Sequence, residues 1–189
     1  MTPTLRGTAP PVTKAALRSQ RLAARAALPA AERAAGDRRR DDALQDLLQG
    51  KRVASYASFG AEPATGGTRT PSTLLPLLLP DGDLDWVRAE GGPPLGRDAV
   101  AACDVVLVPA LAVDRQGVRL GRGGGSYDRA LLRATGLVVA LLHEGELVDA
   151  LPAEPHDVLV HAVALPSGVV HLRPAGPGPL PPAAGAGGT

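Results

Sequence analysis

The sequence predicts an α/β domain with a mainly parallel sheet flanked by helices. Two nearly continuous apolar runs, DVVLVPALAV (residues 104–113) and GLVVALLH (136–143), are typical of strands buried on both faces of a parallel sheet. Segments with helical patterns precede and separate these runs. Buried strands that alternate with helices favour crossover connections between parallel strands, and hence this fold class.

The elements follow in order along the chain. Residues 14–28, KAALRSQRLAARAAL, predict a helix because they contain no Gly or Pro and Thr13 can cap the first turn. A second helix is expected over residues 30–48, ending at Gly50. The order of elements in residues 60–96 is left open, apart from the apolar piece TLLPLLL. The other predicted elements are strands over residues 51–59, 83–88 and 158–166 and a helix over residues 126–135.

A chain of 189 residues has the length of one domain, which we expect to span residues 13–173. Residues 1–12 and 174–189 are rich in Pro, Thr, Gly or Ala and are expected to be disordered. The amino-terminal residues lack the apolar core of a signal peptide, and no apolar run approaches the roughly 18 residues of a membrane span. We therefore expect a cytoplasmic monomer without a membrane partner.

The composition limits the classes of function. A formal net charge of +1 and an aromatic content of 2% disfavour a nucleic-acid partner, so any anion binding must be local. The single cysteine, Cys103, excludes an internal disulfide. It is either a small buried residue of the core or a reactive thiol.

A glycine-rich stretch, RLGRGGGSYDR (residues 119–129), follows the strongest strand prediction. Glycines let backbone amides approach a ligand closely, and arginines match phosphate oxygens. Asp128 suits a Mg²⁺ that bridges a carboxylate and phosphates, or else a favourable charge in the first turn of a helix. Because ligands of parallel sheets gather at the carboxyl ends of strands, we expect a phosphate site at this edge, with a plain glycine-rich hairpin as the alternative.

The predicted first helix carries a row of cations. Lys14, Arg18, Arg21 and Arg25 are spaced by 4, 3 and 4 residues and so share one face. Such a row is either a solvated surface or one side of a polyphosphate clamp.

Taken together, these segments resemble the 5-formyltetrahydrofolate cyclo-ligase family, also called methenyltetrahydrofolate synthetases. VPALAVDRQGV followed by RLGRGGGSYDR is similar to the family signature, and three further segments match in order. TKAALRSQRLAARAALP resembles the basic first helix, VASYASFGAEPAT the strand and substrate loop, and ELVDALPAEPHDV the carboxyl-terminal segment. The resemblance covers about residues 13–165.

The resemblance implies a fold related to the ribose-5-phosphate isomerase and CoA-transferase group. It also implies conversion of 5-formyltetrahydrofolate to 5,10-methenyltetrahydrofolate, with ATP as co-substrate, Mg²⁺ as cofactor, and ADP and phosphate as products. The formyl oxygen attacks the γ-phosphate, and N10 then closes the ring as phosphate leaves. Phosphorylation suits this step because it turns an amide-like oxygen into a good leaving group.

Roles for individual residues are likewise implied by the resemblance. Arg122 and Tyr127 would be catalytic, Asp128 and Asp157 would bind the metal, and Glu62 would hydrogen-bond the reduced pterin. The expected ATP contacts are Lys14, Arg18, Arg119, Leu120, Gly121, Arg122, Gly123, Gly124, Gly125, Ser126 and Tyr127. The expected folate contacts are Ala57, Glu62, Arg122, Gly123, Gly124, Gly125 and Ser126.

The sequence departs from the family pattern at two places. Ser126 occupies the place of the first of two tyrosines, and ATGGTRT after Glu62 departs from the usual loop.

His156 is interpreted as structural, or as support for Asp157. The other hypotheses are a sugar-phosphate enzyme on the same scaffold without ATP turnover, and an anion-binding or nucleic-acid-binding module based on the basic helix.

Overall fold

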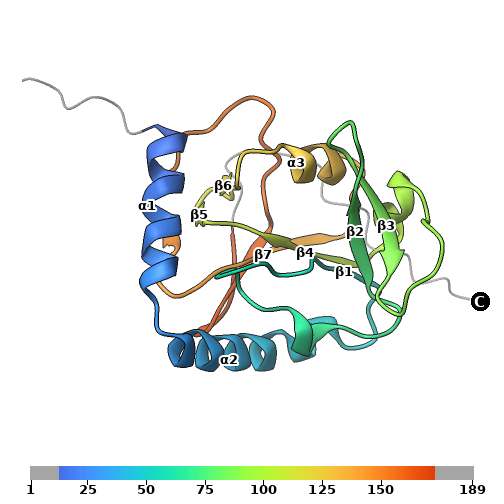
Figure 1. The fold of residues 1–189 in the computed structure, drawn as a ribbon, viewed down its shortest axis with the longest axis horizontal. Coiled ribbons are helices and arrows are strands. Elements are labelled where there is room, and N and C mark those ends of the chain that lie inside the picture. The colour runs from blue at the N-terminus through green and yellow to red at the C-terminus, as the bar shows by residue number, and fades with distance from the viewer. Residues whose placement is uncertain (1–12, 173–189) are drawn as a thin grey trace, which may run out of the picture.

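A seven-stranded sheet with the order β10-β9-β7-β4-β1-β2-β3 forms the centre of the computed structural model (Figure 1). The structure describes residues 13–172, so the segments predicted to be disordered, 1–12 and 174–189, lie outside the described residues. The four inner pairings are parallel, and the two edge pairings, β2 with β3 and β9 with β10, are antiparallel. The predicted α/β class with a mainly parallel sheet is confirmed, whereas the finer assignment to the isomerase and transferase group stays a prediction.

The helices and strands have the following bounds. The helices are α1 (Lys14–Ala27), α2 (Ala30–Leu48) and α3 (Ser126–Leu131), with 3₁₀ turns at Gly66–Thr68 and Arg97–Ala102. The strands are β1 (Val53–Ala54), β2 (Leu74–Leu78), β3 (Leu84–Arg88), β4 (Val105–Pro109), β5 (Ala112–Asp114), β6 (Arg119–Leu120), β7 (Leu137–Leu141), β8 (Leu147–Val148), β9 (Ala162–Leu165) and β10 (Gly168–His171).

The central strands are buried on both faces, as their apolar runs predict. Along β4, Val106 belongs to the core cluster that contains Leu131 of α3, whereas Leu107 belongs to the cluster that contains Leu44 of α2. Alternate residues of a strand point to opposite faces, so one strand supplies both cores. Helices α2 and α3 accordingly lie on opposite sides of the sheet, and α1 stands at one end (Figure 1).

The prediction of one strand over residues 104–113 was wrong. β4 ends at Pro109, and the chain then enters a second sheet of three strands, in the order β6-β5-β8. Leu111, Ala112 and Leu120 form a small separate core, and the Leu111 amide donates to the Leu120 carbonyl at 2.7 Å. An apolar run does not show where a chain changes sheets. The glycine-rich stretch therefore begins with β6 of this second sheet and does not follow the central strand directly.

Other boundaries also differ from the predictions. The apolar piece TLLPLLL contains β2, which forms a hairpin with β3. Gly82, at the turn of this hairpin, has a φ of +81°, which glycine adopts without strain. Strands β1 and β9 are shorter than expected, and α3 ends at Leu131 because the amides of Arg133 and Ala134 bond only three residues back.

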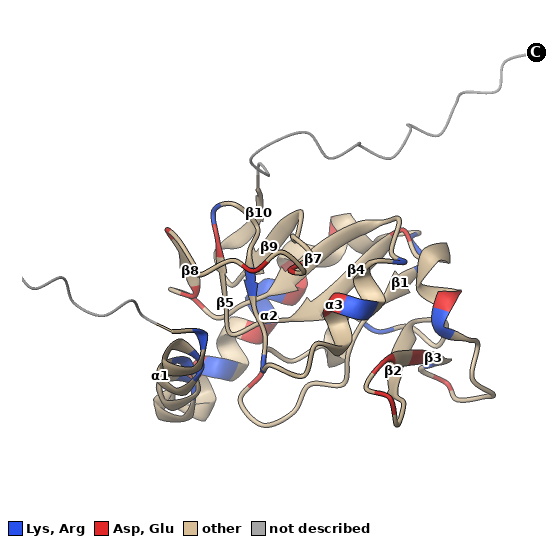
Figure 2. Ribbon diagram, turned by 90° about the horizontal axis from the view of Figure 1, so that it is seen from above, with Lys and Arg blue, Asp and Glu red and all other residues tan. Residues whose placement is uncertain are grey.

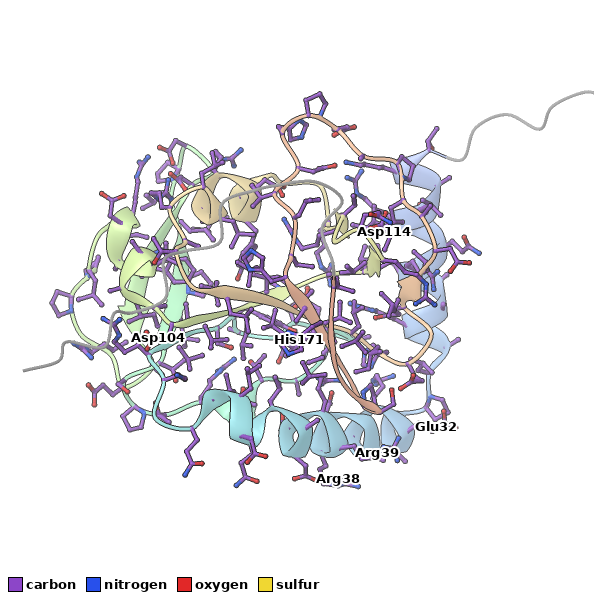
Figure 3. All side chains as sticks on the ribbon, turned by 180° about the vertical axis from the view of Figure 1, so that it is seen from behind. Glu32, Arg38, Arg39, Asp104, Asp114 and His171 are labelled. Carbon is purple, nitrogen blue, oxygen red and sulfur yellow. The ribbon has the colours of Figure 1, made fainter. Side chains whose placement is uncertain are left out.

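Charged residues of both signs are spread over the helices and loops (Figure 2). On α2, Glu32 and Arg38 lie on the exposed side, away from the sheet (Figure 3), whereas Leu44 is fully buried. Within residues 13–172, no helix combines the length and the apolar character that a membrane span requires.

Cys103 is a core residue with 3% of its surface exposed, and burial raises the pKa of its thiol to about 11. Because the thiolate is the reactive form, we expect the native protein to resist alkylation by iodoacetamide at neutral pH and the denatured protein to react fully. Intact-mass spectrometry would measure both. Rapid modification of the native protein would favour the reactive thiol instead.

Candidate active site

A cavity of about 370 Å³ lies at the carboxyl edge of the central sheet, where β1 and β4 end. Most of the predicted site residues line it, namely Ala57, Glu62, Arg119, Gly121, Arg122, Gly123, Gly124, Gly125, Ser126, Tyr127 and Asp128. Lys14, Arg18, Leu120 and Asp157 are not among its lining residues. The structure thus brings the substrate loop and the glycine-rich stretch together, although they are about 60 residues apart in the sequence.

The glycine-rich loop presents free backbone amides beside this cavity. Gly123 and Gly125 have φ values of +101° and +70°, and among residues 13–172 the amides of Gly123–Gly125 have no hydrogen-bond partner. Arg18 reaches the loop from α1, because its Nε donates to the Gly121 carbonyl at 2.9 Å. Unpaired amides in a glycine loop are suited to an anion.

Arg129 does not join the other two arginines of this stretch in the cavity. Its Nη2 donates to the carbonyls of Gly82, at 2.6 Å, and Gly124, at 3.1 Å. Arg129 therefore ties the loop to the β2–β3 hairpin. Of the three arginines expected to match phosphate oxygens, only Arg119 and Arg122 line the cavity, so the expectation is wrong for Arg129 and stays a prediction for the other two.

Arg119, Tyr127 and Asp128 form one polar group in the cavity wall. Nη2 of the largely buried Arg119 donates to Oδ1 of Asp128 at 2.7 Å, and its guanidinium lies 5.8 Å from the centre of the Tyr127 ring. The Tyr127 hydroxyl is buried without a hydrogen-bond partner among the described residues, and burial raises the pKa of this phenol above its ordinary value. An unpaired buried hydroxyl is costly and gains from a ligand that bonds it.

Glu62 and Arg122 form an ion pair in the lining of the cavity. Arg122 Nε donates to Glu62 Oε1 at 2.8 Å, and the other carboxylate oxygen accepts from the Phe59 amide at 2.9 Å. The Glu62 side chain is 9% exposed, whereas that of Arg122 is 48% exposed. After Glu62, the register of the altered loop is set by Thr65, whose hydroxyl donates to the Tyr56 carbonyl at 2.6 Å.

Arg25, which the sequence places in the cation row of the first helix, lines the cavity. Its side chain is 2% exposed, and Nε and Nη2 donate to the two carboxylate oxygens of Glu146 at 2.7 and 2.6 Å. Nη2 also donates to the Ala110 carbonyl, directly after β4. The regular spacing of cations on α1 predicted one common face, but the partner that buries Arg25 is 121 residues away in the sequence.

Lys14 and Asp157 form a second polar cluster outside the cavity lining. Lys14 Nζ lies 2.8 and 3.0 Å from the two carboxylate oxygens of Asp157 and 3.2 Å from Glu154. Burial alone would lower the pKa of Lys14 and raise that of Asp157, but their mutual hydrogen bond and charge attraction, together with hydrogen bonds to Glu154, reverse both shifts. His156 is exposed, and its Nε2 lies 3.3 Å from Glu154.

The two predicted metal ligands differ in how well they suit a cation. Asp128 lines the cavity, and its side chain is 23% exposed, so it can offer an oxygen to a hard cation that also binds phosphate. Both carboxylate oxygens of Asp157 already accept hydrogen bonds from Lys14. The other atoms near Asp157 that could bind a metal belong to Glu154 and His156. Of these two carboxylates, Asp128 can therefore bind a Mg²⁺ in the cavity as it stands, whereas Asp157 would first have to give up its contact with Lys14.

These features define an α/β enzyme with a site at the carboxyl edge of its sheet. The profile of the 5-formyltetrahydrofolate cyclo-ligase family matches residues 11–166, so the chain belongs to this family of ligases. The 5-formyltetrahydrofolate cyclo-ligase of Mycolicibacterium smegmatis is 39% identical over 194 residues, covering 86% of this chain and 99% of its own length.

Solved structures agree with the fold. The NMR structure of Aquifex aeolicus 5,10-methenyltetrahydrofolate synthetase has a TM-score of 0.69 at 25% identity, covering 87% of this chain and 95% of its own. The corresponding protein of Mycoplasma pneumoniae has the same TM-score at 22% identity, covering 81% and 98%, and supports the fold alone.

Proposed function

We propose that this protein converts 5-formyltetrahydrofolate to 5,10-methenyltetrahydrofolate in a reaction that consumes ATP, requires Mg²⁺ and releases ADP and phosphate. The observation that carries the proposal is the single cavity in which Glu62, Arg122 and the free amides of Gly123–Gly125 converge. Such a cavity offers a carboxylate for a pterin and cationic donors for phosphates. The family relationship favours this function over the two other hypotheses.

In this mechanism, the formyl oxygen forms a bond to the γ-phosphorus as the bond between the β- and γ-phosphates breaks and ADP leaves. N10 then attacks the formyl carbon, loses its proton, and expels the former formyl oxygen as phosphate. The loop amides and Arg122 hold the phosphates in line, because phosphoryl transfer depends chiefly on positioning and on neutralising charge. Glu62 orients the pterin ring, and the unpaired Tyr127 hydroxyl donates to a substrate oxygen.

Asp128 is the carboxylate best placed to hold Mg²⁺, which supplies positive charge beside the phosphates when it is bound. Arg119 holds Asp128 in place through their 2.7 Å ion pair. Lys14 and Asp157 are proposed as the second polar group that contacts ATP and metal. In that role Asp157 would exchange its contact with Lys14 for the cation.

The test is the near-ultraviolet absorbance of the purified protein with 5-formyltetrahydrofolate, Mg²⁺ and ATP. Methenyltetrahydrofolate absorbs where its precursor does not, so an ATP-dependent rise is expected, with no rise when ATP is omitted. A flat trace from folded protein would contradict the proposal and would direct attention to phosphate ligands that are not turned over.

Replacing Gly125 with alanine is expected to raise the KM for ATP several-fold. The added Cβ would lie 2.8 Å from Arg129 Nη1, so the loop or Arg129 must move. Gly50→Ala is the matched control, because Gly50 has the same backbone conformation with no atom within 4 Å of the added Cβ. Both variants should lose about 1 kcal/mol of stability. Equal KM values for the two would show that loop geometry does not affect ATP binding.

A further inference from the structure

His143 lies two residues after the end of β7, at the same edge of the sheet as the cavity. Its side chain is buried, and its Nε2 lies 2.9 Å from the carbonyl oxygen of Ala61. A carbonyl oxygen can only accept a hydrogen bond, so Nε2 must carry the proton and donate. The contact therefore fixes both the tautomer of the ring and its orientation.

Ala61 lies next to Glu62, in a segment with few other attachments. Residues 57–60 are exposed, including Phe59 at 75%, and the bonds between Phe59 and Glu62 are internal to the segment. Within the described part of the chain, the segment 57–62 has two hydrogen bonds to other elements. They are Arg122 to Glu62 and His143 to Ala61.

Of these two donors, His143 is the more firmly held, because hydrogen bonds fix the backbone around it. The His143 amide donates to Glu146 Oε2 at 2.8 Å, and Glu146 is fixed by its ion pair with Arg25. The preceding residue, Leu142, is bonded through its amide to the Ala164 carbonyl and through its carbonyl to Arg40. Arg122, by contrast, is half exposed and belongs to the loop that is proposed to bind phosphate.

We propose that His143 is a positioning residue that holds Glu62 in place for the folate substrate, an inference that rests on the proposed function. His143 acts through the Ala61 carbonyl and does not line the cavity. Its loss frees the segment 57–62 and weakens folate binding, while phosphate positioning by the glycine loop is retained.

The first experiment compares His143→Phe with His143→Gln. Phenylalanine keeps the ring but removes the donor, and a second cavity of about 350 Å³ beside His143 leaves room for it. Glutamine retains an N–H near the position of Nε2. We expect His143→Phe to raise the KM for 5-formyltetrahydrofolate roughly tenfold, with kcat and the KM for ATP nearly unchanged, and His143→Gln to restore most of the loss.

His161→Phe is the matched control. The His161 side chain also bonds one backbone group, since its Nδ1 accepts from the Val138 amide at 2.9 Å, but among the described residues it forms no hydrogen bond with the segment 57–62. Its replacement should leave the KM for the folate unchanged. An equal rise in KM in both variants, or no rescue by glutamine, would overturn the inference.

Hydrogen exchange gives a readout that does not depend on turnover. The amides of Phe59 and Glu62, which are hydrogen-bonded within the segment, should exchange faster in His143→Phe than in wild type, whereas those of β7 should not change. If wild-type protein is inactive but this difference is seen, the proposed function fails and the attachment of the segment stands. If wild type is active and His143→Phe changes neither exchange nor KM, His143 has no positioning role.

Discussion

Asp128→Asn is expected to lower turnover at least about 100-fold while leaving the fold intact. Asparagine keeps the shape of the side chain and can still accept from Arg119, but it removes the negative charge from the cavity wall. The Asp128 side chain is partly exposed and is not part of a core cluster, so the stability of the protein should change little. Initial rates at several Mg²⁺ concentrations, together with circular dichroism, would measure both effects.

Asp149→Asn provides the control for this experiment. Asp149 is also paired with an arginine, at 3.2 Å, but its side chain is 96% exposed and lies outside the cavity lining. Its rate should equal that of wild type. If Asp128→Asn were nearly as active as wild type, the assignment of this carboxylate to the metal would be wrong. A partial recovery at high Mg²⁺ would support it.

Arg25→Met is expected to give the largest loss of stability, about 3–5 kcal/mol, because it leaves the Glu146 carboxylate buried without its partner. Both side chains are almost fully buried, and the two hydrogen bonds between them have a bidentate geometry. Methionine fills much of the same volume, so the loss reflects the uncompensated charge rather than a cavity. Urea denaturation followed by circular dichroism would measure the free energy of unfolding.

Two further variants separate the ion pair from other causes. The double variant Arg25→Met with Glu146→Leu removes both charges and should recover much of the loss. Arg115→Met breaks the exposed pair with Asp149 and should change stability little, since solvent screens such pairs. A loss in Arg25→Met no greater than that in Arg115→Met would mean that the buried pair is not important for stability.

The fold was largely predictable because the buried strands carry their own signal. The runs around Val106 and Val139 are apolar at every position, as strands between two cores require. The end of β4 was not predictable, because the residues after Pro109 are equally apolar and only their partners place them in another sheet. The strand predicted over residues 83–88 is confirmed as β3, and Asp81-Gly82 before it is a hairpin signal that could have paired it with β2.

The candidate site was predictable where a local motif marks it and not where distant residues complete it. Glycines and arginines close together in the sequence identified the loop, and the family resemblance supplied Glu62. The cation row on the first helix included Arg25 but not its burial, and His143 gave no signal at all, because each depends on a partner far along the chain. The ion pair between Lys14 and Asp157 could not be predicted from the sequence either, although both residues had been assigned to the site.

The attachment of α1 has a consequence for how the chain assembles. Among the described residues, every hydrogen bond from the side chains of this helix to another element ends between Ala110 and Asp157. A ribosome completes α1 long before it reaches these partners. The helix therefore lacks these partners until Ala110 has emerged, and its set of contacts is complete only when Asp157 has been made.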